Sequence, residues 1–123
     1  MDMSMSTKTT TLMRKLGIKP NLLGWRYIQS AVGIVIDDPM AIDSVTKHIY
    51  PAIARIHGVT ITGVERAIRH SIKCAFSHAP INVLSAVFGN SVDVYRGHAT
   101  NSEFIAAIAQ VVAHEPGNPV WNM

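Results

Sequence analysis

Hydrophobic residues recur three or four positions apart along most of the chain, which is the spacing of amphipathic α-helices and not the alternation of β-strands. The apolar face of one such segment consists of Trp25, Ile28, Val32 and Val35. The segments with this pattern are residues 8–16, 20–36, 43–57, about 62–77, 81–88 and 102–114. The sequence therefore predicts an all-α fold of about six helices.

Helix-breaking residues separate these segments. Asp-Asp-Pro at 37–39 ends the second one, and Gly58 is a natural terminator for the third. Asp43 or Ser44 is expected to cap the third helix at its start. Pro51 lies inside that helix, and we expect it to kink or divide the helix because proline lacks a backbone N–H.

The flanking segments are polar or rich in helix breakers. Residues 1–7 are small, polar and Met-rich, so we predict that they are disordered. Residues 115–123 contain two prolines and a glycine, which indicates a loose tail. Residues 91–99 alternate like a strand but are too short for a sheet, and one of residues 100–102 is expected to cap the last helix. No linker interrupts residues 8–114, which are predicted to form one domain.

The composition is that of a globular chain. Of the 123 residues, 48% are hydrophobic and 15% are charged, and Cys74 is the single cysteine, so no disulfide can form within the chain. No apolar run approaches the length of a membrane span, and the N-terminus lacks a signal-peptide core, so we expect a cytoplasmic location. The net charge of +3 is too small to indicate a nucleic-acid partner by itself.

On a helical wheel, the fourth predicted helix has the clearest division between an apolar face and a polar face. Its apolar face consists of Val64, Ala67, Ile68, Ser71, Ile72 and Ala75, with Phe76 at the edge of the core. The opposite face consists of Arg66, Arg69, Lys73 and Ser77, flanked by Glu65 and His70. On this stripe alone, the charges could simply be solvated, with Glu65 and Arg69 forming a surface pair.

The residues before this helix favour a helix-turn-helix. Ala54 is small where two helices would pack closely, and Gly58 can adopt the positive φ of a tight turn. Thr60 or Thr62 would cap the second helix, and Val64 would bury against the first. Such a turn leaves the N-terminal half of the second helix exposed, where base contacts are made in DNA-binding proteins.

The segment VERAIRHSIKCAF, residues 64–76, strongly resembles the recognition helix of the stage-zero sporulation protein A family of response regulators. Three other stretches are similar to the C-terminal effector domain of that family: GWRYIQSAV from Gly24, SVTKHIYPAIA from Ser44 and TNSEFIAAIA from Thr100. The resemblance extends over about residues 12–113. It implies a sequence-specific transcription regulator of the sporulation-initiation type.

The resemblance also implies how the domain acts. Its fourth helix would enter the major groove of double-stranded DNA at a box resembling TGTCGAA, which often occurs as tandem copies. The base-contacting positions would be Glu65, Arg66 and Arg69, in agreement with the preference of arginine for guanine and of glutamate for cytosine. The positions expected to contact phosphates are Thr60, Thr62, His70, Lys73 and Arg96.

The chain departs from the family pattern at several places. Phe76 replaces a usual tryptophan, Gly63 replaces a small polar residue, and the tail after His114 does not match. These 123 residues also contain no phospho-receiver domain with an acceptor aspartate. We therefore expect this chain to be monomeric in solution, to bind DNA without a phosphoryl donor, and to occupy tandem boxes side by side.

Other functions have weaker support. His70, Cys74 and His78 are spaced four apart and could share a zinc ion, but the row drifts towards the buried face and lacks a fourth ligand. No phosphate loop or nucleophile motif is present, so neither an enzyme nor a cofactor is expected. RNA binding would favour more stacking aromatics than this sequence has.

The main alternative is a protein-interaction module that contacts an RNA polymerase sigma subunit without binding specific DNA. The turn at residues 77–82 and the fifth helix would form that surface. A relative that had lost DNA binding would be expected to have damaged recognition residues. Glu65, Arg66 and Arg69 are all present, which favours DNA binding.

Overall fold

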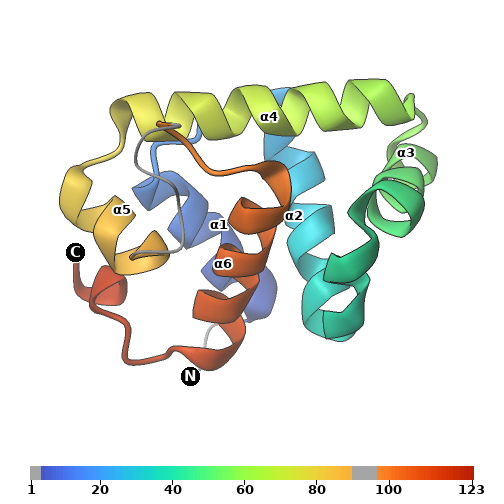
Figure 1. The fold of residues 1–123 in the computed structure, drawn as a ribbon. Helices are drawn as coiled ribbons and strands as arrows, with labels where there is room; N and C mark the ends of the chain where they lie inside the picture. Colours follow the sequence, from blue (N-terminus) through green and yellow to red (C-terminus); the bar gives the residue numbers. More distant parts are fainter. Residues whose placement is uncertain (1–3, 90–96) are drawn as a thin grey trace.

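The structure, a computed structural model, describes residues 4–89 and 97–123 (Figure 1). Within these ranges the chain forms helices and no strand: α1 (Met5–Lys15), α2 (Leu23–Asp37), η1 (Pro39–Ser44), η2 (Val45–Ile49), α3 (Tyr50–His57), α4 (Ile61–His78), α5 (Ile81–Phe88), α6 (Asn101–His114) and η3 (Pro119–Asn122). Here η1 and η3 are short 3₁₀-helices and η2 is a π-helical turn. The predicted all-α fold of about six helices is confirmed.

The longest helix, α4, lies across one side of the fold, and the other helices lie beneath it (Figure 1). α2 and α6 pack against each other and against α4, while α1 and α3 flank them. α5 packs against α6, and η3 packs against α5. The side chains that are fully excluded from solvent at the centre include Leu12, Ile28, Ile53, Ile68, Ile72, Phe104 and Ile108.

The first helix begins three residues earlier than predicted, at Met5 rather than residue 8. The Ser4 hydroxyl accepts the backbone N–H of Thr7 at 3.1 Å and caps the helix, and the Thr9 hydroxyl donates to the Met5 carbonyl. The prediction that residues 1–7 are disordered is therefore wrong for residues 5–7. Residues 1–3 lie outside the described part of the chain.

The predicted third helix is divided, as the position of Pro51 suggested. α3 begins only at Tyr50, so that Pro51 lies in its first turn, where its missing N–H costs no intrahelical bond. The preceding residues form η1 and η2, and the Ser44 side chain makes no capping bond. The expectation of a helix capped at residues 43–44 was thus wrong, because the π-turn and the proline together shift the start of the regular helix.

The last helix forms where it was predicted, and the tail after it packs against the fold. Thr100 and Glu103 form a reciprocal capping box, which starts α6 at Asn101. After α6, Val120 is fully buried and the Asn118 amide donates to the Ala86 carbonyl of α5 at 2.9 Å. The predicted loose tail is therefore wrong, because its apolar side chains have a core to pack against.

Candidate nucleic-acid interface

α3 and α4 are joined by a tight turn that the sequence pattern anticipated. Gly58 adopts φ 66°, and the backbone N–H groups of Gly58 and Val59 both donate to the Ala54 carbonyl. Thr60 then caps α4 by accepting the backbone N–H of Gly63 at 3.0 Å. The first turn of α4 is intact despite Gly63. The left-handed conformation of Gly58 allows the chain to reverse into α4 within three residues.

The inner face of α4 is buried as predicted. Val64, Ile68, Ile72 and Ala75 are fully excluded from solvent, and Ala67 is partly buried against the same core. Phe76 lies at the edge of the core, where the centre of its ring is 5.0 Å from that of Phe88 and the two rings are tilted. The inner face therefore fixes which residues of α4 face outward.

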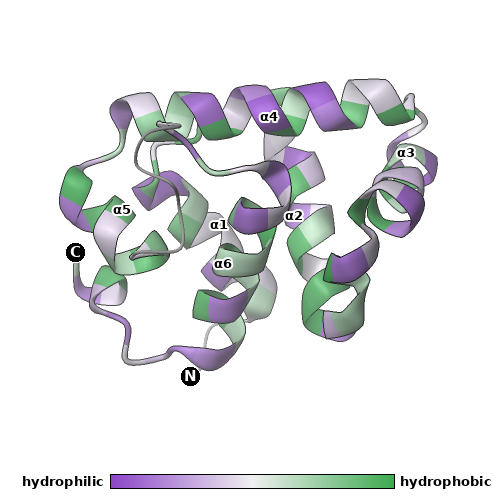
Figure 2. Cartoon of the chain, in the orientation of Figure 1, coloured by the Kyte–Doolittle hydropathy of each residue, from purple (hydrophilic) through white to green (hydrophobic). Residues whose placement is uncertain are grey.

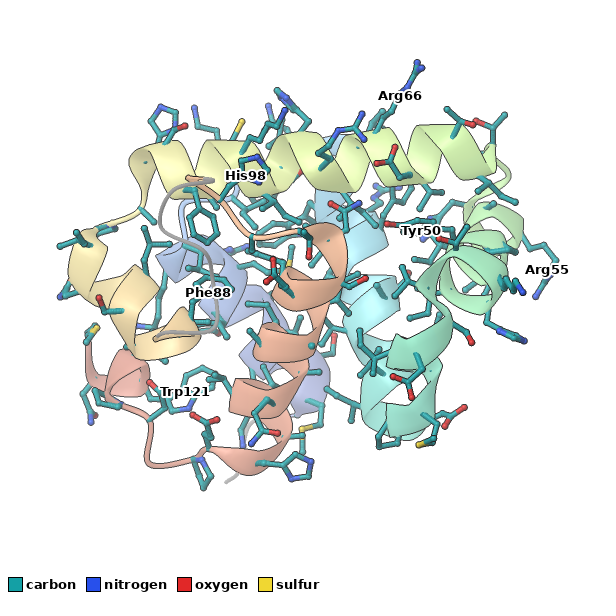
Figure 3. The ribbon with its side chains drawn as sticks, viewed as in Figure 1. Tyr50, Arg55, Arg66, Phe88, His98 and Trp121 are labelled. Carbon is teal, nitrogen blue, oxygen red and sulfur yellow. The ribbon has the colours of Figure 1, made fainter. Side chains whose placement is uncertain are left out.

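The outer face of α4 is polar and cationic. Arg66, Arg69, His70 and Lys73 are all exposed, and Figure 2 shows hydrophilic residues recurring along this helix. In Figure 3 the Arg66 side chain points directly away from the fold. Arg66 and Lys73 form no ion pair with any residue in the described ranges. Their charges are therefore available to an external partner.

One ion pair crosses the outer face. The Arg69 guanidinium donates to the Glu65 carboxylate one helical turn earlier. The Arg69 side chain is 45% exposed and that of Glu65 is 32% exposed. Exposed pairs four residues apart stabilise a helix by only about 0.3–0.5 kcal/mol, so a ligand can compete for either group at little cost.

The backbone of Glu65 is also held from outside its own helix, by a residue that the sequence analysis considered only as a possible helix cap. The Asn101 side-chain amide donates to the Glu65 carbonyl at 3.2 Å and to the Tyr50 hydroxyl at 2.9 Å. Tyr50 lies below α4 (Figure 3). Burial raises the pKa of Tyr50 and the nearby Glu65 carboxylate raises it further, while the Asn101 hydrogen bond and Arg69 oppose these effects.

The expected phosphate-contacting residues differ in their surroundings. The Thr60 hydroxyl is already engaged as the cap of α4, whereas Thr62 in the first turn is exposed. His70 is exposed one turn beyond Arg66. Arg96 lies outside the described residues, as does most of the segment 91–99.

The row of possible metal ligands on α4 does not form a site. The His70 ring nitrogen lies 3.7 Å from the Cys74 sulfur, and the His78 ring bonds to the Cys74 backbone carbonyl. In the part of the chain that the structure describes, no group of three or more potential ligands is close enough to hold a metal ion. None of the described helices combines the length and hydropathy needed to cross a membrane.

A comparison with protein families matches residues 9–112 to the family described as "Sporulation initiation factor Spo0A C terminal". The match extends from α1 nearly to the end of α6 and includes the whole of α3, α4 and the turn between them. The match agrees with the resemblance of residues 64–76 to the recognition helix of the same family and with the exposed cationic face of α4. The chain belongs to this family of DNA-binding regulatory domains of sporulation initiation.

Proposed function

We propose that α3 and α4 form a helix-turn-helix and that α4 enters the major groove of a TGTCGAA-like box. The observation that carries this proposal is the division of α4 into two faces. The inner face is buried along its length, while Arg66 projects outward soon after an exposed first turn and Arg69 and Lys73 are exposed farther along the helix. Family membership supports DNA as the partner.

The chemistry of three residues suits base recognition. The guanidinium groups of Arg66 and Arg69 are planar donors that can bond to guanine O6 and N7 together. The Glu65 carboxylate can accept from the amino group of cytosine while it remains beside Arg69. Lys73 and His70 lie farther along the helix and are suited to phosphates, which set the register without reading sequence.

The direct test is a fluorescence anisotropy titration of the domain with a TGTCGAA duplex and with a scrambled duplex of equal length. At about 0.15 M salt, where non-specific binding is weakened, the box is expected to bind at least roughly tenfold more tightly. Equal affinity for the two duplexes would overturn the proposal.

Two matched variants locate the binding surface. Arg66→Ala and Lys8→Ala each remove one positive charge, but Lys8 lies near the start of α1, away from α4 (Figure 1). Arg66→Ala is expected to lose preference for the box by about 1–3 kcal/mol, while Lys8→Ala retains it. Similar losses in both variants would indicate a diffuse electrostatic effect and no defined reading surface.

A second candidate function, contact with an RNA polymerase sigma subunit, is favoured by one observation. Pro80, Ile81 and Asn82 are all exposed at the start of α5, with Ile81 82% exposed, so the turn proposed for this contact is accessible to a partner. Ile81→Ser is expected to weaken pull-down of a sigma subunit while leaving DNA affinity unchanged. Retained sigma binding in this variant would argue against α5 as the contact.

A further inference from the structure

The Asn101 side chain connects three helices at one point. It begins α6, and its amide donates both to the Tyr50 hydroxyl, at the start of α3, and to the Glu65 carbonyl of α4. These partners are 51 and 36 residues away in the sequence. The contact is therefore tertiary, and it ends on a residue at the proposed DNA-reading surface.

Asn101 is not needed to cap its own helix. That role belongs to Thr100, whose hydroxyl accepts the Glu103 N–H at 3.1 Å, while the Glu103 carboxylate accepts the Thr100 N–H at 2.8 Å. The capping box fixes the backbone at Asn101 and leaves the side-chain amide free to bond elsewhere. Both amide protons are then used on residues of other helices.

The Glu65 carbonyl connects two of the three proposed base-contacting residues, Glu65 and Arg69. In an α-helix the carbonyl of residue 65 accepts the N–H of residue 69, so this oxygen already connects the backbones of Glu65 and Arg69. A carbonyl oxygen has two lone pairs, and Asn101 bonds to the same oxygen. The rotation of α4 about its axis is thus restrained at the turn that carries both side chains.

We propose that Asn101, together with Tyr50, is a positioning residue that fixes the orientation of Glu65 and Arg69 for base recognition. The inference rests on the proposed function of α4. Tyr50 is 6% exposed, so its ring supplies a rigid buried platform from which the hydroxyl accepts the Asn101 amide. Supporting hydrogen bonds of this kind determine how accurately a binding group is held.

The first test is independent of DNA. Urea unfolding of Asn101→Ala, Tyr50→Phe and the double variant forms a double-mutant cycle, because the two side chains are in direct contact. The double variant is expected to lose less stability than the sum of the two single losses. Strictly additive losses would show that the Asn101–Tyr50 bond is not formed in solution, and would overturn the proposal.

The second test compares Asn101→Ala with a matched control, Asn118→Ala. Asn118 is also a side-chain amide that joins separate elements, through the Ala86 carbonyl and the Glu115 carboxylate, but it lies at the η3 end of the fold. Asn101→Ala is expected to reduce the affinity ratio of box to scrambled duplex about fivefold, the equivalent of roughly 1 kcal/mol. Asn118→Ala, at a temperature where both variants are folded, is expected to retain the ratio.

The outcomes separate this inference from the proposed function. If the unmodified domain shows no preference for the box, the proposed function fails. If it shows a preference that Asn101→Ala and Asn118→Ala alter equally, or that Asn101→Ala leaves unchanged, the positioning role alone is overturned. Tyr50→Phe keeps the ring and removes only the hydroxyl, so it supplies a milder variant, expected to lose about twofold of the ratio, should Asn101→Ala fail to fold.

Discussion

Alanine at Gly24 is expected to destabilise the domain, because α2 packs closely against α4 at this glycine. A Cβ atom on Gly24 would lie 2.0 Å from the Ser71 hydroxyl oxygen and 2.5 Å from the Ala67 carbonyl oxygen. The second contact is with backbone, so no side-chain rotation can relieve it. α2 and α4 would have to separate, which would also displace the buried face of α4.

The expected change in stability can be estimated by comparison with a second glycine in the same helix. Gly33 also lies inside α2, but a Cβ there would meet no atom within 4 Å. Gly33→Ala is therefore expected to stabilise the domain by about 1 kcal/mol through helix propensity alone. Gly24 is the second residue of α2, so Gly24→Ala gains at most this term, and it loses about 3 kcal/mol to overpacking, for a net loss of at least roughly 2 kcal/mol.

Thermal unfolding followed by circular dichroism measures both variants. With about 4 °C per kcal/mol for a domain of this size, Gly24→Ala is expected to melt about 8 °C lower and Gly33→Ala about 4 °C higher than the parent. Adding Ser71→Ala to Gly24→Ala removes the nearer contact but leaves the Ala67 carbonyl, so recovery is expected to be partial. A Gly24→Ala variant that melted as high as Gly33→Ala would refute the close packing of α2 against α4.

Three further predictions concern α4 and assembly. Arg69→Ala is expected to lose about 1–3 kcal/mol of binding free energy and to relax the preference at one base pair. Lys73→Ala is expected to weaken binding to all duplexes alike and to lower the slope of log affinity against log salt by about one unit. Anisotropy titrations at several salt concentrations measure both effects, and the reverse result would exchange the roles of the two residues. Ile68→Ala or Ile72→Ala is expected to lose about 2–5 kcal/mol in urea unfolding, because both side chains are fully buried; a variant as stable as the parent would contradict that burial. Sedimentation is expected to show a monomer at micromolar concentration. Titration of two-box DNA without a phosphoryl donor is expected to show a cooperativity of about 1–2 kcal/mol. A tight dimer in solution, or cooperativity that is unchanged when the boxes are shifted by half a helical turn, would contradict this prediction.

The sequence predicted α4 well because its structure is determined locally. Its apolar residues repeat over the full length of the helix, Gly58 marks the turn before it and Thr60 marks its cap. Each of these signals acts over three or four residues, which is the range that a helical wheel can read. The orientation of Arg66 and Lys73 towards solvent followed from the same pattern.

The parts that sequence reasoning missed depend on contacts between distant segments. The residues next to Val120 in the sequence do not indicate that its side chain packs into the core. The prolines and glycine around residues 120–121 favoured the prediction of a loose tail over that of a packed apolar segment. Likewise, the role of Asn101 depends on partners in α3 and α4. The one local signal was the Thr100–Glu103 capping box, which frees the intervening asparagine from a capping role.

The central claim is that the outer face of α4 is the DNA-reading surface, and NMR mapping of backbone amides tests it most directly. The labelled domain would be titrated with a TGTCGAA duplex and, separately, with the scrambled duplex. We expect the box to cause its largest shift changes at residues 60–73, with the first turn of α1 unaffected and with weaker changes for the scrambled duplex. Changes centred on α5 or α1, with residues 60–73 unperturbed, would contradict the account.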